Sequence, residues 1–235
     1  MTDAEYLIRV FCASILLAMA CGTAMAQERS TCFGTTSDGS LENGWKLPLN
    51  GANFTAYSII GSMAGRTYVH SDVYEVLLNS YQVLASSIPG KVFVYGETGK
   101  KDGGSFEPHK THRNGLSVDF MVPVVDKSGH SVPLPTNVLN KWGYGIEFDA
   151  SGQYKDLTID AESMVEHLYQ LHRTAEEQGV RIWRVIFAPE LQPLLHSTTR
   201  WPYLREKVEF SERRSWVRHD EHYHVDFIVP CTASD

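Results

Sequence analysis

The stretch HYHVDFIV, residues 222–229, alternates polar and apolar side chains along most of its length. Such alternation is typical of a β-strand, in which successive side chains point to opposite faces of a sheet. Tyr223, Val225 and Phe227 then enter the core, whereas the two histidines and the aspartate project from the other face. The stretch therefore predicts a strand that presents a polar site on one side.

A second alternating stretch, LSVDFMVPV at residues 116–124, also predicts a strand. Its even-numbered residues are apolar, and Asp119 lies on the opposite face. If the two strands share a sheet, Asp119 can meet His222 and His224 on one polar face. The glycine before the strand allows a tight turn, which can bring His112 back beside Asp119.

Helical patterns accompany these strands. Apolar residues at a spacing near 3.6 predict one helix over residues 72–88 and another over 160–178, where a glycine follows as the stop. Further short strands are predicted at 91–95 and 180–187. An excursion rich in glycine and proline, residues 126–158, can form the wall of a cleft. Together these elements predict an α+β fold with a small central antiparallel β-sheet, flanked by helices and long loops.

The 235-residue chain has 43% hydrophobic and 21% charged residues, a composition typical of globular proteins. Its formal net charge of −7 argues against nucleic acid as a partner, because phosphate binding needs a surplus of lysine and arginine. Residues 1–26 are typical of a secretory signal peptide, with an apolar run too short to span a bilayer and small residues before Gln27. We expect export, a single domain over residues 27–235 and no stable membrane span after signal cleavage.

Signal cleavage also changes the cysteine count. Cys12 and Cys21 leave with the signal, so that only Cys32 and Cys231 remain. An even pair in an exported chain predicts a disulfide, here between the two ends of the domain. Cys21 leaves open the alternative of a lipoprotein.

Half of the ten histidines fall in two short clusters. The first cluster lies in PHKTHRNGLSVDF (residues 108–120) and the second in RHDEHYHVDF (residues 218–227). Their members are His109, His112, His219, His222 and His224. Imidazole nitrogen and carboxylate oxygen are common zinc ligands, and a catalytic zinc site uses three protein ligands and keeps a fourth position for water. A zinc finger is excluded because the mature chain offers only two cysteines.

Two motifs, in this order, carry a family resemblance: H-x(6)-D at His112 and Asp119, and H-x-H at His222 and His224. Further landmarks are NGWKLPLNG (43–51), YGETGKKDGGSFEPHKTHRNGLSVDF (95–120), VIFAPELQPLL (185–195) and HDEHYHVDFIVPC (219–231). The sequence resembles the zinc peptidases that unite D-alanyl-D-alanine carboxypeptidases and dipeptidases with lysostaphin-type endopeptidases. Within that group it is most similar to the penicillin-insensitive murein endopeptidases.

The resemblance implies that His112, Asp119 and His224 bind Zn²⁺, so that the central sheet carries a zinc site. Two neutral imidazoles and one carboxylate leave such a site with a net positive charge of about one, which favours activation of water and polarises the scissile carbonyl. The implied reaction is hydrolysis of an amide bond.

For proton transfer, the resemblance implies that His222 works beside the metal as a catalytic or transition-state-stabilising group. His219 is the leading alternative for the acid/base role. Glu221 is a further candidate base, because Glu221-x-x-His224 resembles the E-x-x-H motif of the related dipeptidases. His109 is expected to contact a metal ligand or the substrate rather than the metal itself.

Two residues depart from the family pattern. Asp226 stands where an arginine is expected soon after H-x-H, and Ser117 stands where an acidic residue is expected. These departures concern the expected substrate contacts rather than the zinc ligands. The aromatic residues Trp142, Tyr144 and Tyr154 could line a groove for glycan or peptide, or pack locally.

The function that follows from the resemblance is an exported zinc-dependent murein endopeptidase of the periplasm, with peptidoglycan as its partner. The bond that is cut can be the D-Ala to meso-diaminopimelate crosslink or an L,D bond. The alternatives are a noncatalytic protein that binds peptidoglycan as a scaffold, and a wall-clearing hydrolase or toxin that serves an envelope-spanning secretion machine.

Overall fold

The computed structural model of the chain describes residues 27–233. The predicted signal peptide at residues 1–26 lies outside this range. The helices are α1 (Ile59–Met63), α2 (Ser71–Ser87), α3 (Ala161–Glu177) and α4 (Trp201–Lys207), with 3₁₀ segments η1 (Val138–Gly143) and η2 (Gln192–Leu195). The strands of the largest sheet are β4 (Phe54–Ala56), β6 (Phe93–Tyr95), β7 (Ser117–Met121), β12 (Arg181–Ile186), β13 (Glu209–Phe210) and β14 (His222–Ile228).

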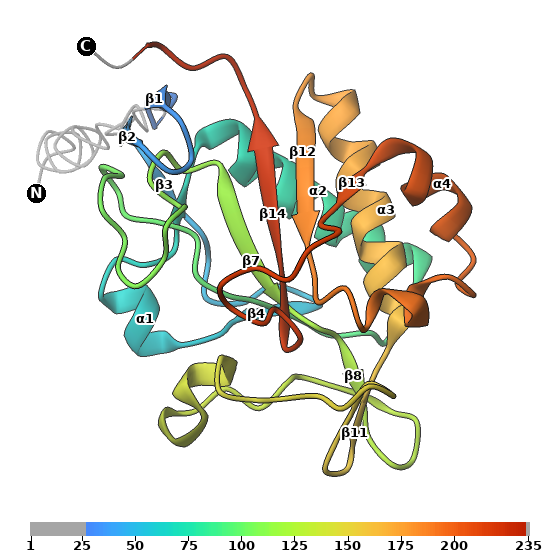
Figure 1. Cartoon of the computed structure of the whole chain (residues 1–235). Coiled ribbons are helices and arrows are strands. Elements are labelled where there is room, and N and C mark those ends of the chain that lie inside the picture. The colour runs from blue at the N-terminus through green and yellow to red at the C-terminus, as the bar shows by residue number, and fades with distance from the viewer. Residues whose placement is uncertain (1–26, 234–235) are drawn as a thin grey trace, which may run out of the picture.

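Three smaller sheets surround the largest one. They consist of β1 (Thr31–Gly34) with β2 (Gly39–Glu42), of β3 (Trp45–Lys46) with β5 (Tyr68–Val69), and of β8 (Val124–Val125), β9 (Ser131–Val132), β10 (Gln153–Tyr154) and β11 (Leu157–Ile159). The strands β8 to β11 and η1 form the predicted excursion, which projects from one end of the molecule (Figure 1).

The six-stranded sheet has the order β13-β12-β14-β7-β6-β4. Its centre is antiparallel: β14 pairs with β12 on one side and with β7 on the other, and β6 pairs with β7. Both edge strands pair parallel, β4 with β6 and β13 with β12. Parallel neighbours need a long crossover, and α2 and α4 lie in those two connections. The predicted α+β class is confirmed, and the site strands β7 and β14 lie in the antiparallel centre.

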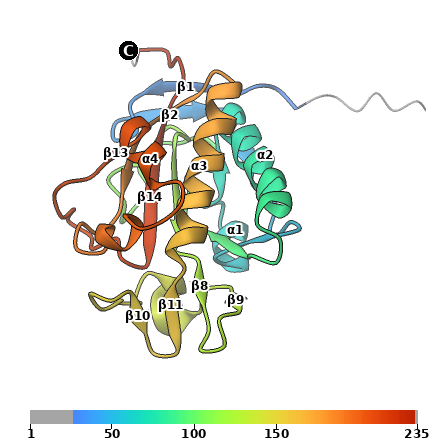
Figure 2. The same ribbon diagram turned by 90° about the vertical axis from the view of Figure 1, so that its right-hand side faces the viewer.

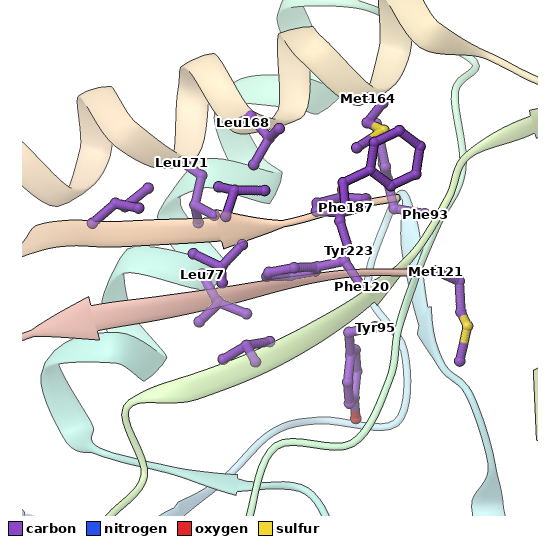
Figure 3. Close-up of a cluster of buried hydrophobic side chains, with 14 of the residues drawn as sticks. Leu77, Phe93, Tyr95, Phe120, Met121, Met164, Leu168, Leu171, Phe187 and Tyr223 are labelled. Atoms are coloured by element: carbon purple, nitrogen blue, oxygen red, sulfur yellow. The ribbon is translucent and has the colours of Figure 1, made fainter. Parts of the chain in front are cut away.

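Helices α2 and α3 lie side by side across one face of this sheet (Figure 2). Figure 3 shows Met164, Leu168 and Leu171 of α3 directed toward Phe120 of β7 and Tyr223 of β14. All five side chains are buried, and each contributes roughly 1.5–3 kcal/mol through removal of apolar surface from water. This packing fixes which face of β7 and β14 is apolar, and it leaves the opposite face to the polar side chains.

Helix α3 begins and ends as the sequence predicts. The Asp160 carboxylate accepts a hydrogen bond from the Ser163 N–H at 3.1 Å and forms an ion pair with Lys91 at 2.6 Å, so it satisfies a free N–H of the first turn. The helix is followed by Gly179, which has a φ of 73° and takes the left-handed conformation that ends many helices.

The two ends of the described chain are joined covalently. Cys32 on β1 and Cys231 after β14 form a disulfide across a sequence separation of 199 residues, which confirms the predicted pair. Within residues 27–233 no helix combines the length and the apolar character that a membrane span requires.

Candidate metal centre

The pairing of β7 with β14 brings the two sequence motifs together. Their antiparallel register places Asp119 directly opposite His224. Gly96, which follows β6 on the other side of β7, lies against Asp119 and Tyr144. A Cβ atom at this position would lie 2.6 Å from the Tyr144 hydroxyl oxygen and 2.9 Å from the Asp119 Cβ atom. The close approach of groups around Asp119 therefore requires a residue without a side chain at position 96.

These residues lie at the base of a cleft of about 900 Å³. Its walls come from α1, from the loop 107–111, from residues 141–144 of the excursion and from the loop 215–217. The histidines that line it are His109, His219, His222 and His224. His112 and Asp119 are fully buried behind them. The prediction that the excursion walls a cleft is confirmed for its residues 141–144.

Asp119 is the centre of the site. Its Oδ1 atom lies 2.8 Å from His224 Nδ1 and 3.3 Å from His112 Nε2. Its Oδ2 atom accepts a hydrogen bond from the Tyr144 hydroxyl at 3.0 Å and lies 3.9 Å from His222 Nε2. Burial raises the pKa of Asp119, but the imidazoles of His112 and His222 outweigh burial and hold this pKa well below its usual range. An ionised carboxylate among imidazoles is a donor set that suits a divalent metal.

His112 has the properties of a metal ligand. Its Nδ1 atom lies 3.1 Å from the carbonyl oxygen of Thr98 and must carry the proton, since a carbonyl only accepts. The lone pair is then on Nε2, which is buried and has no hydrogen-bond partner among residues 27–233. Coordination to a metal would satisfy this atom. The residues present therefore fit the metal that the family resemblance implies.

A second nitrogen candidate is His109. With His112 and Asp119 it forms a group in which each residue offers one possible ligand atom, all within 4.8 Å of one another. His109 Nε2 donates to the Glu97 carboxylate at 2.6 Å, which leaves Nδ1 3.9 Å from Asp119 Oδ2. Two imidazoles, those of His109 and His224, thus lie beside Asp119. The distance from Asp119 Oδ1 to His224 Nδ1, 2.8 Å, is shorter than the 3.9 Å from Asp119 Oδ2 to His109 Nδ1.

His222, His219 and Glu221 lie together beside Asp119. His222 Nδ1 is 2.8 Å from Glu221 Oε1, and the rings of His219 and His222 are 4.5 Å apart. Strand β14 begins only at His222, so strand alternation does not hold Glu221 away from the histidines.

The two imidazoles differ in basicity. Burial lowers the pKa of His222, but the carboxylates of Glu221 and Asp119 outweigh burial and raise it. Burial and the neighbouring His222 both lower the pKa of His219, to about 4. The pKa of His222 is therefore shifted above that of an ordinary imidazole and the pKa of His219 below it, and such a separation suits acid/base chemistry.

Sequence reasoning missed the network behind His109. Arg66 forms an ion pair with Glu97, and the Tyr57 hydroxyl donates to the same carboxylate at 2.8 Å. Burial raises the pKa of Glu97, but hydrogen bonds from His109 and Arg66 outweigh it and lower this pKa. Tyr57 and Arg66 lie far from Glu97 in the sequence and outside the quoted motifs, so only the fold reveals that they contact it.

Tyr144 lines the cleft, as the predicted groove requires, and it also contacts Asp119 directly. Its hydroxyl accepts the N–H of Glu97 at 2.8 Å and donates to Asp119. Lys141 and Trp142, which lie on the N-terminal side of Gly143 and Tyr144, have φ values of 53° and 56°, and such strained backbone is concentrated at functional sites. Tyr154, by contrast, packs 6.0 Å from Phe148 between ring centroids and does not line the cleft.

A buried carboxylate between imidazoles at the base of an open cleft, with further imidazoles able to transfer protons, defines a metal-dependent hydrolase. The sequence profile of the penicillin-insensitive murein endopeptidases matches residues 32–235. The chain belongs to this family of metallopeptidases, as the resemblance of its motifs predicts. Comparison with individual curated proteins finds no match.

Proposed function

We propose that this protein is a zinc-dependent murein endopeptidase that hydrolyses amide bonds in the peptide crosslinks of peptidoglycan. The bond is either the D-Ala to meso-diaminopimelate crosslink or an L,D bond. The observation that carries the proposal is the approach of three donor atoms behind the cleft: His112 Nε2, Asp119 Oδ1 and His224 Nδ1. Family membership supports peptidoglycan as the substrate.

In this proposal His112, Asp119 and His224 hold the zinc ion. Nitrogen and oxygen donors without a thiolate suit a catalytic zinc site. When bound, zinc polarises the scissile carbonyl and lowers the pKa of a water molecule. The buried position of His112 and Asp119 fixes the donors, while His224 faces the cleft in which the peptide must lie.

His219 is the proton acceptor in this proposal. Its Nδ1 atom lies 2.8 Å from the carbonyl of Val217, so the free lone pair is on Nε2. Its low pKa leaves that nitrogen unprotonated at neutral pH. His219 Nε2 can therefore take a proton from water and return it to the leaving amine.

His222 then stabilises the negative charge that develops on the carbonyl oxygen. Glu221 holds its Nδ1 atom and raises its pKa, and the protonated ring can donate a hydrogen bond from Nε2. Glu221 does not line the cleft and contacts His222 Nδ1 instead. We therefore assign Glu221 to the orientation of His222 rather than to the role of base.

We also propose that a signal peptide at residues 1–26 directs a single-domain enzyme to the periplasm. The Cys32–Cys231 disulfide supports an oxidising compartment, and cleavage of the bond in peptidoglycan requires the enzyme to be on the side of the membrane where the wall lies.

The direct test is digestion of purified muropeptide dimers of defined linkage. We expect the zinc-loaded protein to convert dimers to monomers, a chelator to abolish this conversion and added zinc to restore it. Mass spectrometry of the new termini then identifies the bond. Dimers that stay intact in the presence of zinc, or that are cut equally well in the chelator, would contradict the proposal.

Variants separate the two possible ligand sets. His112→Ala and His224→Ala should lose bound zinc, whereas His109→Ala should retain it. Retention of zinc by His224→Ala together with its loss in His109→Ala would instead identify His109 as the ligand. His130→Ala is a matched control because His130 is exposed and outside the cleft. Binding of peptidoglycan without hydrolysis of any dimer would favour the scaffold alternative.

A further inference from the structure

Asp226, which departs from the family pattern, does not line the cleft. It is fully buried in β14, two residues after His224 and on the same face of the strand. Its Oδ1 atom lies 2.8 Å from His224 Nε2. Asp226 is therefore not a solvated surface residue, because its carboxylate contacts a histidine of the cleft directly.

Both neighbouring strands hold this carboxylate in place. Ser117 on β7 and Arg184 on β12 lie opposite Asp226 in the sheet register. The Ser117 hydroxyl donates to Asp226 Oδ1 at 2.5 Å, and Arg184 Nε donates to Oδ2 at 2.7 Å. The carboxylate is therefore fixed from two sides, and its negative charge is balanced by the guanidinium.

Both ring nitrogens of His224 lie 2.8 Å from a carboxylate oxygen, Nε2 from Asp226 and Nδ1 from Asp119. In the proposed zinc site Asp119 and His224 Nδ1 are both ligands, so Nδ1 cannot keep a proton when the metal is bound. Nε2 then carries the ring proton, which it donates to Asp226. A carboxylate that holds one ring nitrogen while the other binds metal increases the basicity of the ligand and fixes the orientation of its ring.

We propose that Asp226 is a positioning residue for the metal centre: it holds the Nε2–H of His224 and so directs Nδ1 toward the metal. This inference rests on the zinc site of the proposed function. Arg184 balances the negative charge of Asp226. The net charge of the zinc site is then the sum of the charges of the ion and its three ligands.

The first test is the zinc affinity of Asp226→Asn, measured by competition with a chromogenic chelator. We expect the affinity to fall by about 10- to 100-fold, the usual effect of the loss of a group that orients a ligand. Asp160→Asn is the matched control, because Asp160 is also a carboxylate that pairs with a cation and a serine, although it is only partly buried, and it lies outside the cleft. Its zinc affinity should be unchanged.

The second test needs no variant, so it holds even if Asp226→Asn does not fold. In the zinc-loaded wild-type protein, ¹H–¹⁵N correlation of the imidazoles should show His224 protonated at Nε2 and bound through Nδ1. A proton on Nδ1 would overturn the inference. So would a zinc affinity of Asp226→Asn that stays within about twofold of the wild-type affinity, because a larger loss is expected. In both cases a wild-type protein that binds zinc and cleaves dimers would leave the proposed function intact.

Discussion

Tyr144→Phe removes a single oxygen atom between Glu97 and Asp119, and we expect it to weaken both the fold and the metal centre. The hydroxyl accepts the Glu97 N–H at 2.8 Å and donates to Asp119 Oδ2 at 3.0 Å. A hydrogen bond to a charged group contributes roughly 1.5–3 kcal/mol, and a buried N–H left without a partner costs roughly 1–3 kcal/mol. The metal-free protein should therefore lose about 3–5 kcal/mol of unfolding free energy.

The same change releases one oxygen of the Asp119 carboxylate. Without the donor from Tyr144, the carboxylate can rotate away from the position in which Oδ1 lies between His112 and His224. We expect zinc affinity to fall by about 10- to 100-fold. Urea unfolding in the presence of a chelator measures the first effect, and competition for zinc measures the second.

Tyr154→Phe is the matched control for this prediction, because Tyr154 belongs to the same excursion and does not line the cleft. It should change neither quantity. If Tyr144→Phe lost less than about 1 kcal/mol of unfolding free energy and bound zinc as tightly as wild type, the Tyr144 hydroxyl would not hold Asp119.

Three further changes affect the stability of the protein. Gly96→Ala should lower the unfolding free energy by about 1–3 kcal/mol and weaken zinc binding, because the new Cβ would meet Tyr144 and Asp119; equal urea midpoints and zinc affinities would contradict this. Replacement of both disulfide cysteines by alanine should lower the unfolding free energy by up to about 5 kcal/mol, since the bridge closes a loop of nearly the whole chain, and an unchanged urea midpoint would exclude that stabilisation. Burial lowers the pKa of His167 to about 3, below that of the unfolded state, so protonation favours unfolding as pH falls below about 6.5. Between pH 7.5 and pH 5, His167→Phe should therefore lose about 2 kcal/mol less unfolding free energy than wild type; parallel pH curves would contradict the assignment.

The elements that carry the site could be predicted because their patterns are local. Alternation in residues 116–124 and 222–229 indicates both strands and both faces, and the burial of Tyr223 and the register of Asp119 with His224 agree with it. Asp160 and its following helix could be found in the same way, because a capping carboxylate acts on the N–H groups next to it in sequence.

The contacts that complete the site could not be predicted, because they join segments with no common pattern. Arg66 reaches Glu97 from the segment after α1, and Tyr144 reaches Asp119 from the excursion. Arg184 reads only as a polar residue of a strand until the register places it opposite Asp226. The parallel edges of the sheet also depend on the path of long connections, which alternation does not describe.

Backbone strain and imidazole orientation are linked in this site. His112 and His219 have φ values of 68° and 56°, in the left-handed region that costs an ordinary residue roughly 1–2 kcal/mol. In each case Nδ1 lies near a backbone carbonyl, that of Thr98 at 3.1 Å and that of Val217 at 2.8 Å. These contacts place the proton on Nδ1 and leave Nε2 as the basic nitrogen. The strained backbone and the oriented imidazoles occur at the same two residues, so a substitution that relaxes the backbone at either position would gain stability at the expense of the site.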